Sequence, residues 1–370
     1  MSQYISGSSS KIGAVKETVF DQQYSPISGR PASTALRMTS ESLSSTYNRL
    51  DEGILMASKT APQQDLGSVG VSGGINVVLN PSFIDWILEA GLGVKENTTP
   101  SNQPESGATL AEYTYTLADP DADIPSSALE LWRGNEGFFY TGMTVSTLSI
   151  DATAQDFVKA DISFNGTREN WISANPSDSK VGPSTNLGSY KCTKARLYNN
   201  TADCDEVSDF TNLGWDDSSC PANTVYDVEK AVLSIDNGLE TTPATYCSGL
   251  YANQPTHGQR TVSLTCNVPY STGFETFRQS YYANENAAPL ALMLCFGSKE
   301  QITYVPYGEV DSVTEPAHQV LVVLPNVQIT SASANASGAG LIDGSYVGTA
   351  LSIGTTEPIK VVVRTYTAIS

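Results

Sequence analysis

The chain has 370 residues, 40% of them hydrophobic, and a formal net charge of −19. This length accommodates about two domains of ordinary size. Binding to nucleic acid through phosphate neutralisation is excluded, because it needs clustered Lys and Arg, and the chain has 20 of these against 39 Asp and Glu. Two interpretations of the charge stay open: a soluble acidic protein, or an acidic wall that DNA slides past without sticking.

The amino-terminal residues 1–30 are polar and rich in Ser, Gly and Pro, so we expect an extended arm and no signal peptide. No run approaches the roughly 18 apolar residues of a membrane helix. The six cysteines form no Cys-x-x-Cys pair and only two histidines exist, which disfavours zinc. Without export we expect reduced thiols, although a disulfide among Cys192, Cys204 and Cys220 stays open.

The first half of the chain predicts strands and one short helix. Residues 34–50 alternate weakly and are rich in Ser and Thr, as in an exposed strand, and 69–79 predicts a stronger strand with a polar face. A helix is predicted over 81–92, with Asn80 as its N-cap and glycines at its end. Its apolar stripe should cover a sheet. Further strands are predicted at 111–117, 138–151 and 157–165.

The second half repeats this order after an interruption. Asn, Ser, Asp, Gly and Cys dominate 169–222, which we interpret as an inserted loop or linker. Strand patterns resume at 226–236 and 260–268, and a second helix with a candidate capping box is predicted over 271–282. Further strands are predicted at 289–296, 301–305, 320–330 and 359–366.

One β-rich pattern occurs twice. Leu-Ser-Ile-Asp ends a strand-like run at 148–151 and again at 233–236, and an alternating run follows each copy. We therefore predict a mainly β protein of two tandem β-sandwich modules, each with one covering α-helix. Two such modules can pair side by side and repeat around a ring. The predicted organisation is an arm at 1–30, a first module at 31–168, the insertion at 169–222 and a second module at 223–370.

Motifs for catalysis or metal binding are incomplete. Asp119-Pro-Asp-Ala-Asp123 resembles the opening of a calcium loop, but Ile124 stands where the sharp turn needs glycine, which favours a solvated acidic loop. Gly338-Ala-Gly340 does not complete a phosphate-binding pattern. Neither His257 nor His318 stands in a nucleophile turn, and 39 acidic residues make carboxylate pairs indistinguishable from chance. We predict no enzyme activity, no cofactor and no metal.

Several runs of the first half carry a resemblance to a known family. They are Leu36 to Leu43, Gly70 to Leu79, Phe83 to Gly93, and Tyr140 to Gly166. Together they resemble the tail tube proteins of long-tailed bacteriophages with non-contractile tails. In the second half, Val228 to Asp236 and Gly258 to Thr265 are similar to the later part of the same proteins. The resemblance covers most of 30–168 and 224–370, and 169–222 departs from it.

The resemblance implies a structural role. Such proteins build rings whose inner wall is a β-barrel closed between subunits, and the rings stack into a tube through which the genome passes. Two modules per chain imply a trimeric ring with pseudo-sixfold symmetry, whereas a single true module would require a hexamer. The implied partners are further copies of the chain and the terminator, tape-measure and tail-tip proteins. The implied location is the virion tail, assembled in the host cytoplasm, and a surrounding contractile sheath stays open.

Alternating polar residues are the candidates for the lumen. They lie opposite apolar residues on the predicted strands, so one polar face would meet the channel. The alternative is that this face meets bulk solvent on an outer sheet. The arm 1–30 and the loop 119–125 are candidates for ring-to-ring contact. The lumen candidates are Ser72, Asn76, Lys159, Asp161, Ser163, Asn165, Thr261, Ser263, Thr265 and Asn267.

Three other functions were weighed. A tail-tip or baseplate protein of related fold would form one ring and no tube. A glycan-binding β-sandwich of a host-recognition appendage would use Trp132 and the aromatic run 138–140 as a sugar platform, although their place before a strong strand favours a core or a subunit contact. A hydrolase without a recognisable motif is the third.

Overall fold

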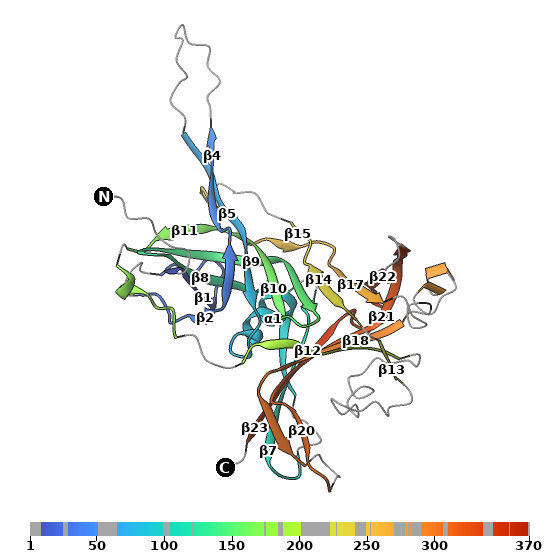
Figure 1. Ribbon diagram of the computed structural model, residues 1–370. Coiled ribbons are helices and arrows are strands. Elements are labelled where there is room, and N and C mark those ends of the chain that lie inside the picture. Colours follow the sequence, from blue (N-terminus) through green and yellow to red (C-terminus); the bar gives the residue numbers. More distant parts are fainter. Residues whose placement is uncertain are drawn as a thin grey trace.

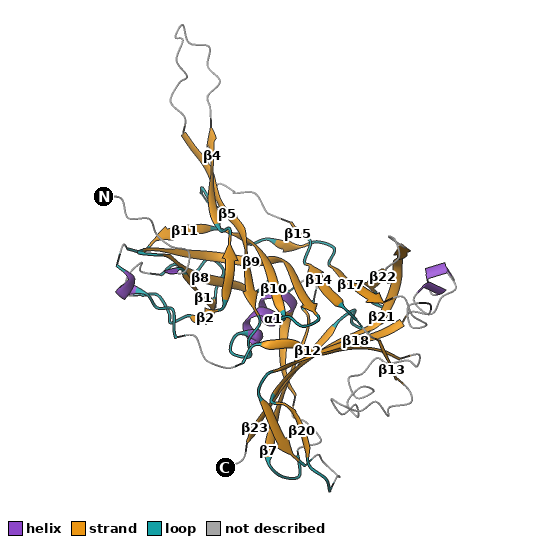
Figure 2. Cartoon of the chain, viewed as in Figure 1, coloured by secondary structure: helices purple, strands orange, loops and turns teal. Residues whose placement is uncertain are grey.

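The computed structural model describes residues 9–24, 29–50, 65–98, 104–119, 122–173, 175–183, 188–200, 223–226, 228–240, 249–251, 253–269, 275, 278–279, 281–282, 290–305, 310–335, 343–354 and 356–368. Strands dominate these ranges, which confirms the prediction of a mainly β fold (Figure 2). Among the described residues, no helix is both long and apolar enough to cross a membrane.

In the first half of the chain, the described residues form eleven strands and one α-helix. They are β1 (Lys11–Lys16), β2 (Thr34–Leu36), β3 (Met38–Glu41), β4 (Ser44–Leu50), β5 (Asp65–Val78), α1 (Ile84–Leu92), β6 (Gly93–Thr98), β7 (Ala108–Leu117), β8 (Ser126–Arg133), β9 (Glu136–Thr153), β10 (Lys159–Gly166) and β11 (Arg168–Trp171). A 3-10 turn, η2 (Pro176–Asp178), follows.

The second half is also built from strands. They are β12 (Tyr190–Asn200), β13 (Asn223–Tyr226), β14 (Lys230–Asp236), β15 (Leu239–Glu240), β16 (Thr256–His257), β17 (Thr261–Pro269), β18 (Leu290–Ser298), β19 (Gln301–Tyr304), β20 (Val313–Pro316), β21 (His318–Asn335), β22 (Asp343–Ala350) and β23 (Lys360–Ala368). Within the predicted second helix, the described residues 275, 278–279 and 281–282 are helical.

One antiparallel sheet forms the centre of the molecule (Figure 1). In the described part of the chain it is eight strand positions wide, with β3 and β4 sharing one position at its edge. The order of the strands is β3 and β4 together, then β5, β10, β9, β14, β17, β22 and β21. We call this the central sheet. The β4–β5 hairpin projects from one end of the molecule, and β7, β20 and β23 extend at the opposite end (Figure 1).

Two strands of 18 residues connect the central sheet to flanking strands. The first half of β9 pairs with β8, and β8 pairs with β1, whereas the second half of β9 pairs with β10 and β14. The first half of β21 pairs with β18 and β23, and its second half pairs with β22. Because β23 also pairs with β7, the carboxyl-terminal strand joins both halves of the chain.

The core lies on one side of the central sheet, under α1 (Figure 2). Ile87 and Leu88 of α1 are buried in the same cluster as Leu148 of β9 and Leu233 of β14. The predicted helix is therefore confirmed, but it begins later than expected: Asn80 caps a preceding turn by accepting a hydrogen bond from the backbone N–H of Ser82 (2.8 Å). Its end agrees with the prediction, since Gly93 has φ +106° at the C-cap.

Two regions carry more regular structure than their sequence pattern indicates. Residues 11–16, within the expected arm, form β1, which pairs with both β2 and β8. Residues 190–200, within the expected insertion, form β12, which pairs with β18. Both strands obtain their partners from distant parts of the chain, which local periodicity does not register. Residues 201–222 lie outside the described part of the chain.

The two Leu-Ser-Ile-Asp runs are neighbours in the central sheet. β9 and β14 pair antiparallel, with Ser149 opposite Ser234. Strands that pair in this way do not occupy equivalent places in two tandem copies. The shared pattern has a simpler physical cause, because each strand buries Leu and Ile on one face and exposes Ser and Asp on the other.

Candidate functional site

The ten residues predicted for the lumen lie on one face of the central sheet, on β5, β10 and β17. All ten are exposed or half-buried. Their neighbours in sequence point the other way and are buried, as with Ile162 of β10 and Leu264 of β17. Strict alternation of this kind is what a sheet with one wet face requires. We call this surface the polar face.

The polar face continues over six further strands that the sequence interpretation did not include: β3, β4, β9, β14, β21 and β22. Residues paired directly opposite each other share a face, so the register identifies the additional members. The alternation of polar and apolar residues along these strands is the sequence signal by which they could have been identified. The additional members are Ser40, Ser44, Thr46, Thr147, Ser149, Asp151, Lys230, Ser234, Asp236, Gln328, Ser331, Ser333, Ser345 and Thr349.

Hydroxyl and amide groups dominate the polar face, and its few charges are largely compensated. Lys230 pairs with Asp151 across β14 and β9 (2.7 Å). Lys159 pairs with Asp156, just before β10 (2.6 Å). These half-exposed ion pairs stabilise the fold little, but they leave few positive charges available to phosphates. Between β5 and β10 the surface forms a shallow depression lined by residues including Asn76, Asp161 and Ser163.

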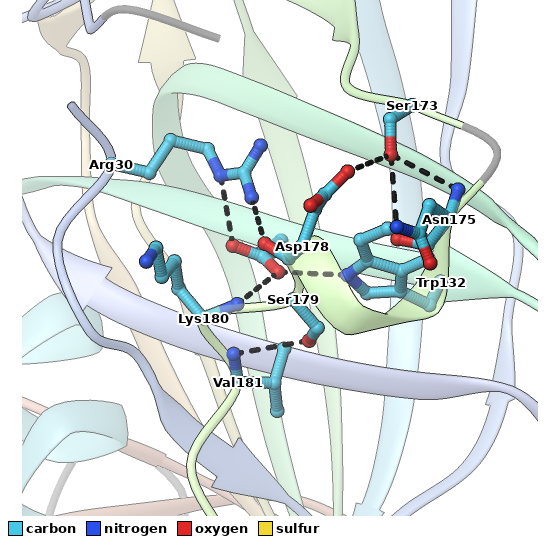
Figure 3. A network of polar contacts seen from close by, with 9 residues as sticks. Arg30, Trp132, Ser173, Asn175, Asp178, Ser179, Lys180 and Val181 are labelled. Carbon is cyan, nitrogen blue, oxygen red and sulfur yellow. Dashed lines mark hydrogen bonds and ion pairs between the residues drawn. The ribbon is translucent and has the colours of Figure 1, made fainter. Parts of the chain in front are cut away.

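A buried polar network fixes the chain around β8 (Figure 3). Arg30 Nε donates to Glu130 Oε2 (3.2 Å), and both side chains are 0% exposed. Glu130 Oε1 also accepts hydrogen bonds from Trp132 Nε1 (2.7 Å) and the Lys180 backbone N–H (2.8 Å). Arg30 Nη2 reaches the Asp178 carbonyl (2.6 Å). Every one of these contacts is internal, so the network holds segments together.

The other residues considered for chemistry also have structural surroundings. Trp132 and Tyr140 are 0% exposed, so this aromatic group offers no sugar platform. His318 begins β21, where its Nδ1 lies 3.3 Å from Thr365 Oγ1, and burial holds the pKa of its imidazole below the ordinary value of 6.5. The side chain of His257 lies outside the described part.

The cysteines are only partly described. Cys266 and Cys295 are buried cysteines, and burial raises the pKa of the Cys266 thiol to about 12, which makes it unreactive at neutral pH. The side chains of Cys192, Cys204, Cys220 and Cys247 lie outside the described part. Among the described residues, no group of three or more His, Cys, Asp and Glu is arranged to hold a metal ion.

The geometry thus presents a broad wall of hydroxyl and amide groups. A family model described as phage tail tube protein matches residues 7–353. The chain belongs to the phage tail tube protein family. The search of curated proteins found no match. As a tail tube protein, the chain is a structural component of the virion, and its copies assemble into the tube of the phage tail.

Proposed function

We propose that the tail tube protein contributes its central sheet to a β-barrel closed between subunits, with the polar face lining the lumen. The observation that carries this proposal is the continuity of the polar face across the whole width of the central sheet, above an opposite face that is buried from β5 to β22. Closure would remove the sheet edges. A barrel of three such sheets exceeds the roughly 16 to 18 strands at which barrels enclose an aqueous channel.

The strand order supports two tandem modules within each chain. Along the chain, β4, β5, α1, β8, β9 and β10 correspond to β14, β17, the helical residues 275, 278–279 and 281–282, β18, β21 and β22. In the sheet, the order β4–β5–β10–β9 corresponds to β14–β17–β22–β21. The polar residues coincide in this correspondence of strands, with Ser72 matching Ser263 and Asn76 matching Asn267. Three copies would then form a pseudo-sixfold ring, which we favour over a hexamer.

DNA would pass this lumen without being held. Ser, Thr and Asn form weak, exchangeable hydrogen bonds with phosphates, and the uncompensated Asp161 and Asp236 would repel them. We propose no catalytic activity. We further propose a non-contractile tail, assembly in the host cytoplasm, and contacts with terminator, tape-measure and tail-tip proteins. The arm 1–30 and the loop 119–125 are proposed ring-to-ring contacts.

A tail-tip ring protein is the second candidate, since one closed ring would use the same sheet.

The lumen assignment is tested by placing positive charge on the polar face. The triple variant Asp161→Lys, Ser263→Lys and Thr265→Lys adds four charges per chain. We expect tubes to form and DNA ejection from virions to slow, because lysines bind phosphates, and we expect high salt to restore the rate. The measurement is the time course of DNA release from triggered virions at two ionic strengths.

A matched control places the same charge elsewhere. Thr109→Lys, Glu136→Lys and Ser177→Lys also add four charges, at exposed positions outside the polar face. We expect this variant to eject DNA at the wild-type rate. Wild-type ejection from virions carrying the polar-face variant, with tubes intact, would refute the lumen assignment.

A further inference from the structure

The central sheet ends in two edges whose outer sides have no strand partner in the described part of the chain. At one end, β3 and β4 pair with β5 on their inner side. At the other end, residues 328–335 of β21 pair with β22 on their inner side. Open edges of this length are templates for pairing with another chain. Both edge segments are mostly polar, and neither contains a proline or a lysine, which are residues that protect strand edges from pairing.

The seam between β9 and β14 shows how such edges can meet. In the tandem correspondence, β9 matches β21, and β14 matches the β3–β4 edge. β9 and β14 pair antiparallel over seven consecutive residues, from Thr147 with Asp236 to Thr153 with Lys230. The strand directions also agree. Neighbouring strands of the central sheet alternate in direction over eight positions, so its two outer strands run antiparallel to each other. When two copies stand side by side in a ring, the facing edges are therefore antiparallel as well.

The correspondence also gives a register. Asp161, the β10 partner of Asn76, lies opposite Ser149 of β9, and Ser345, the β22 partner of Asn267, lies opposite Ser333 of β21. Both strands are irregular at the same place, between Val145 and Thr147 in β9 and between Ile329 and Ser331 in β21. Aligned in this way, Thr147 and Ser149 match Ser331 and Ser333. Through their partners in β5 and β17, Ser44 and Thr46 match Ser234 and Asp236.

We propose that the outer edge of β3–β4 pairs antiparallel with residues 328–335 of β21 in the next copy of the chain, with Thr46 opposite Ser331 and Ser44 opposite Ser333. This inference rests on the proposed barrel and names the strands that close it. The pairing repeats between chains the Ser149–Ser234 contact made within one chain. Hydroxyl side chains directly opposite each other stabilise a sheet by hydrogen bonding across the strands.

The other face of the new seam is also accounted for. Tyr47 is 52% exposed on the face of β4 opposite the polar face. The corresponding face of β21 carries the half-buried Ala332 and Ala334. In the proposed register Ala332 lies opposite Ser45 and diagonal to Tyr47, so a neighbouring copy would place this small side chain against the ring of Tyr47. The seam would thus bury an aromatic side chain that the single chain leaves in water.

Cysteine cross-linking in assembled tubes tests the pairing. The double variant Thr46→Cys and Ser331→Cys places one thiol on each edge, and a short bifunctional thiol reagent is added to purified tubes. We expect covalent multimers on a denaturing gel. Thr46→Cys with Thr349→Cys is the matched control, because Thr349 lies on the same face one strand further in. This control variant should stay monomeric. Wild type should also stay monomeric, which shows that the native cysteines do not cross-link between chains.

Two results separate this inference from the proposed function. If hollow tubes are seen by electron microscopy but the double variant stays monomeric, the edge pairing is wrong while the tube stands. If purified wild-type protein forms no ring or tube at any concentration or with its tail partners, both proposals fail. Ser149→Cys with Ser234→Cys should cross-link within the chain and confirms that the reagent spans opposite positions.

Discussion

Glu130 and Arg30 have lost all contact with water, so the two side chains compensate each other's charge inside the protein. Removing two charges from water costs several kcal/mol per ion, and the pair alone is weak evidence for stability. The further hydrogen bonds from Trp132 and Lys180 complete the environment of the carboxylate. The network is therefore sensitive to removal of one partner.

Glu130→Gln should destabilise the protein by about 3–5 kcal/mol, because it removes the carboxylate charge that contacts the buried Arg30 guanidinium. The measurement is the free energy of unfolding in urea. Lys230→Met is the control: it breaks a half-exposed pair with Asp151, for which we expect a loss of about 0–1 kcal/mol. Equal losses for the two variants would contradict the assigned role of burial.

His318 should make stability depend on pH. Burial lowers its folded-state pKa below the unfolded value of 6.5, while Glu300 acts in the opposite direction. The unfolded chain then binds the proton more readily, so the contribution of neutral His318 is complete above pH 6.5 and is lost as pH falls below it.

His318→Gln should lose less stability than wild type between pH 7.5 and pH 5.5, because glutamine does not titrate. Urea unfolding at both pH values measures the difference, and titrating carboxylates common to the two proteins cancel in the comparison. An identical pH dependence in the variant would show that His318 titrates normally.

At the scale of elements, the join between β3 and β4 depends on one glycine of β5. Gly73 has φ +135°, and a Cβ there would lie 2.3 Å from the Ser42 carbonyl oxygen. Because the Cβ would meet backbone atoms, no change of side-chain rotamer could relieve the contact, and an alanine at this position would strain the backbone. Gly70 lies in the same strand, and a Cβ there would meet nothing within 4 Å.

Gly73→Ala should cost about 1–3 kcal/mol of stability and distort the β3–β4 edge. Because this edge is the proposed subunit contact, the variant should also assemble poorly. Gly70→Ala should be close to wild type in both respects. Urea unfolding and electron microscopy of tubes measure the two effects, and normal assembly of Gly73→Ala would argue against the assigned edge.

At the scale of the whole molecule, each chain supplies a sheet that is incomplete alone. Its edges meet water until a neighbour arrives, so assembly and stability should be coupled. In the proposed tandem arrangement, one chain would make the same lateral contact twice, once internally and once with its neighbour. Three copies of such a chain would close the proposed pseudo-sixfold ring.

Tubes should therefore show rings of three chains. The measurement is the largest covalent species from the Thr46→Cys and Ser331→Cys variant, together with the rotational symmetry of end-on views in electron microscopy. We expect cross-linking to end at a trimer. A series that continues to six chains would contradict the trimeric ring and support a hexamer.

Much of the sheet could be read from the sequence. In β5, β10 and β17 polar and apolar residues alternate, so the wet face of each strand follows from local pattern alone. The same holds for α1, where an apolar stripe and Gly93 mark the helix. Neighbouring residues decide these features, and they need no knowledge of distant parts of the chain.

Only the tertiary structure decided which strands stand side by side. Many strands alternate apolar and polar residues as Leu-Ser-Ile-Asp does, so this alternation cannot distinguish an equivalent strand from an adjacent one. The two strands that carry the motif, β9 and β14, are adjacent. The contact of Arg30 with Glu130 joins residues 100 positions apart. Pairing of this kind depends on the whole arrangement of the chain, because a strand edge accepts any partner of matching length and face.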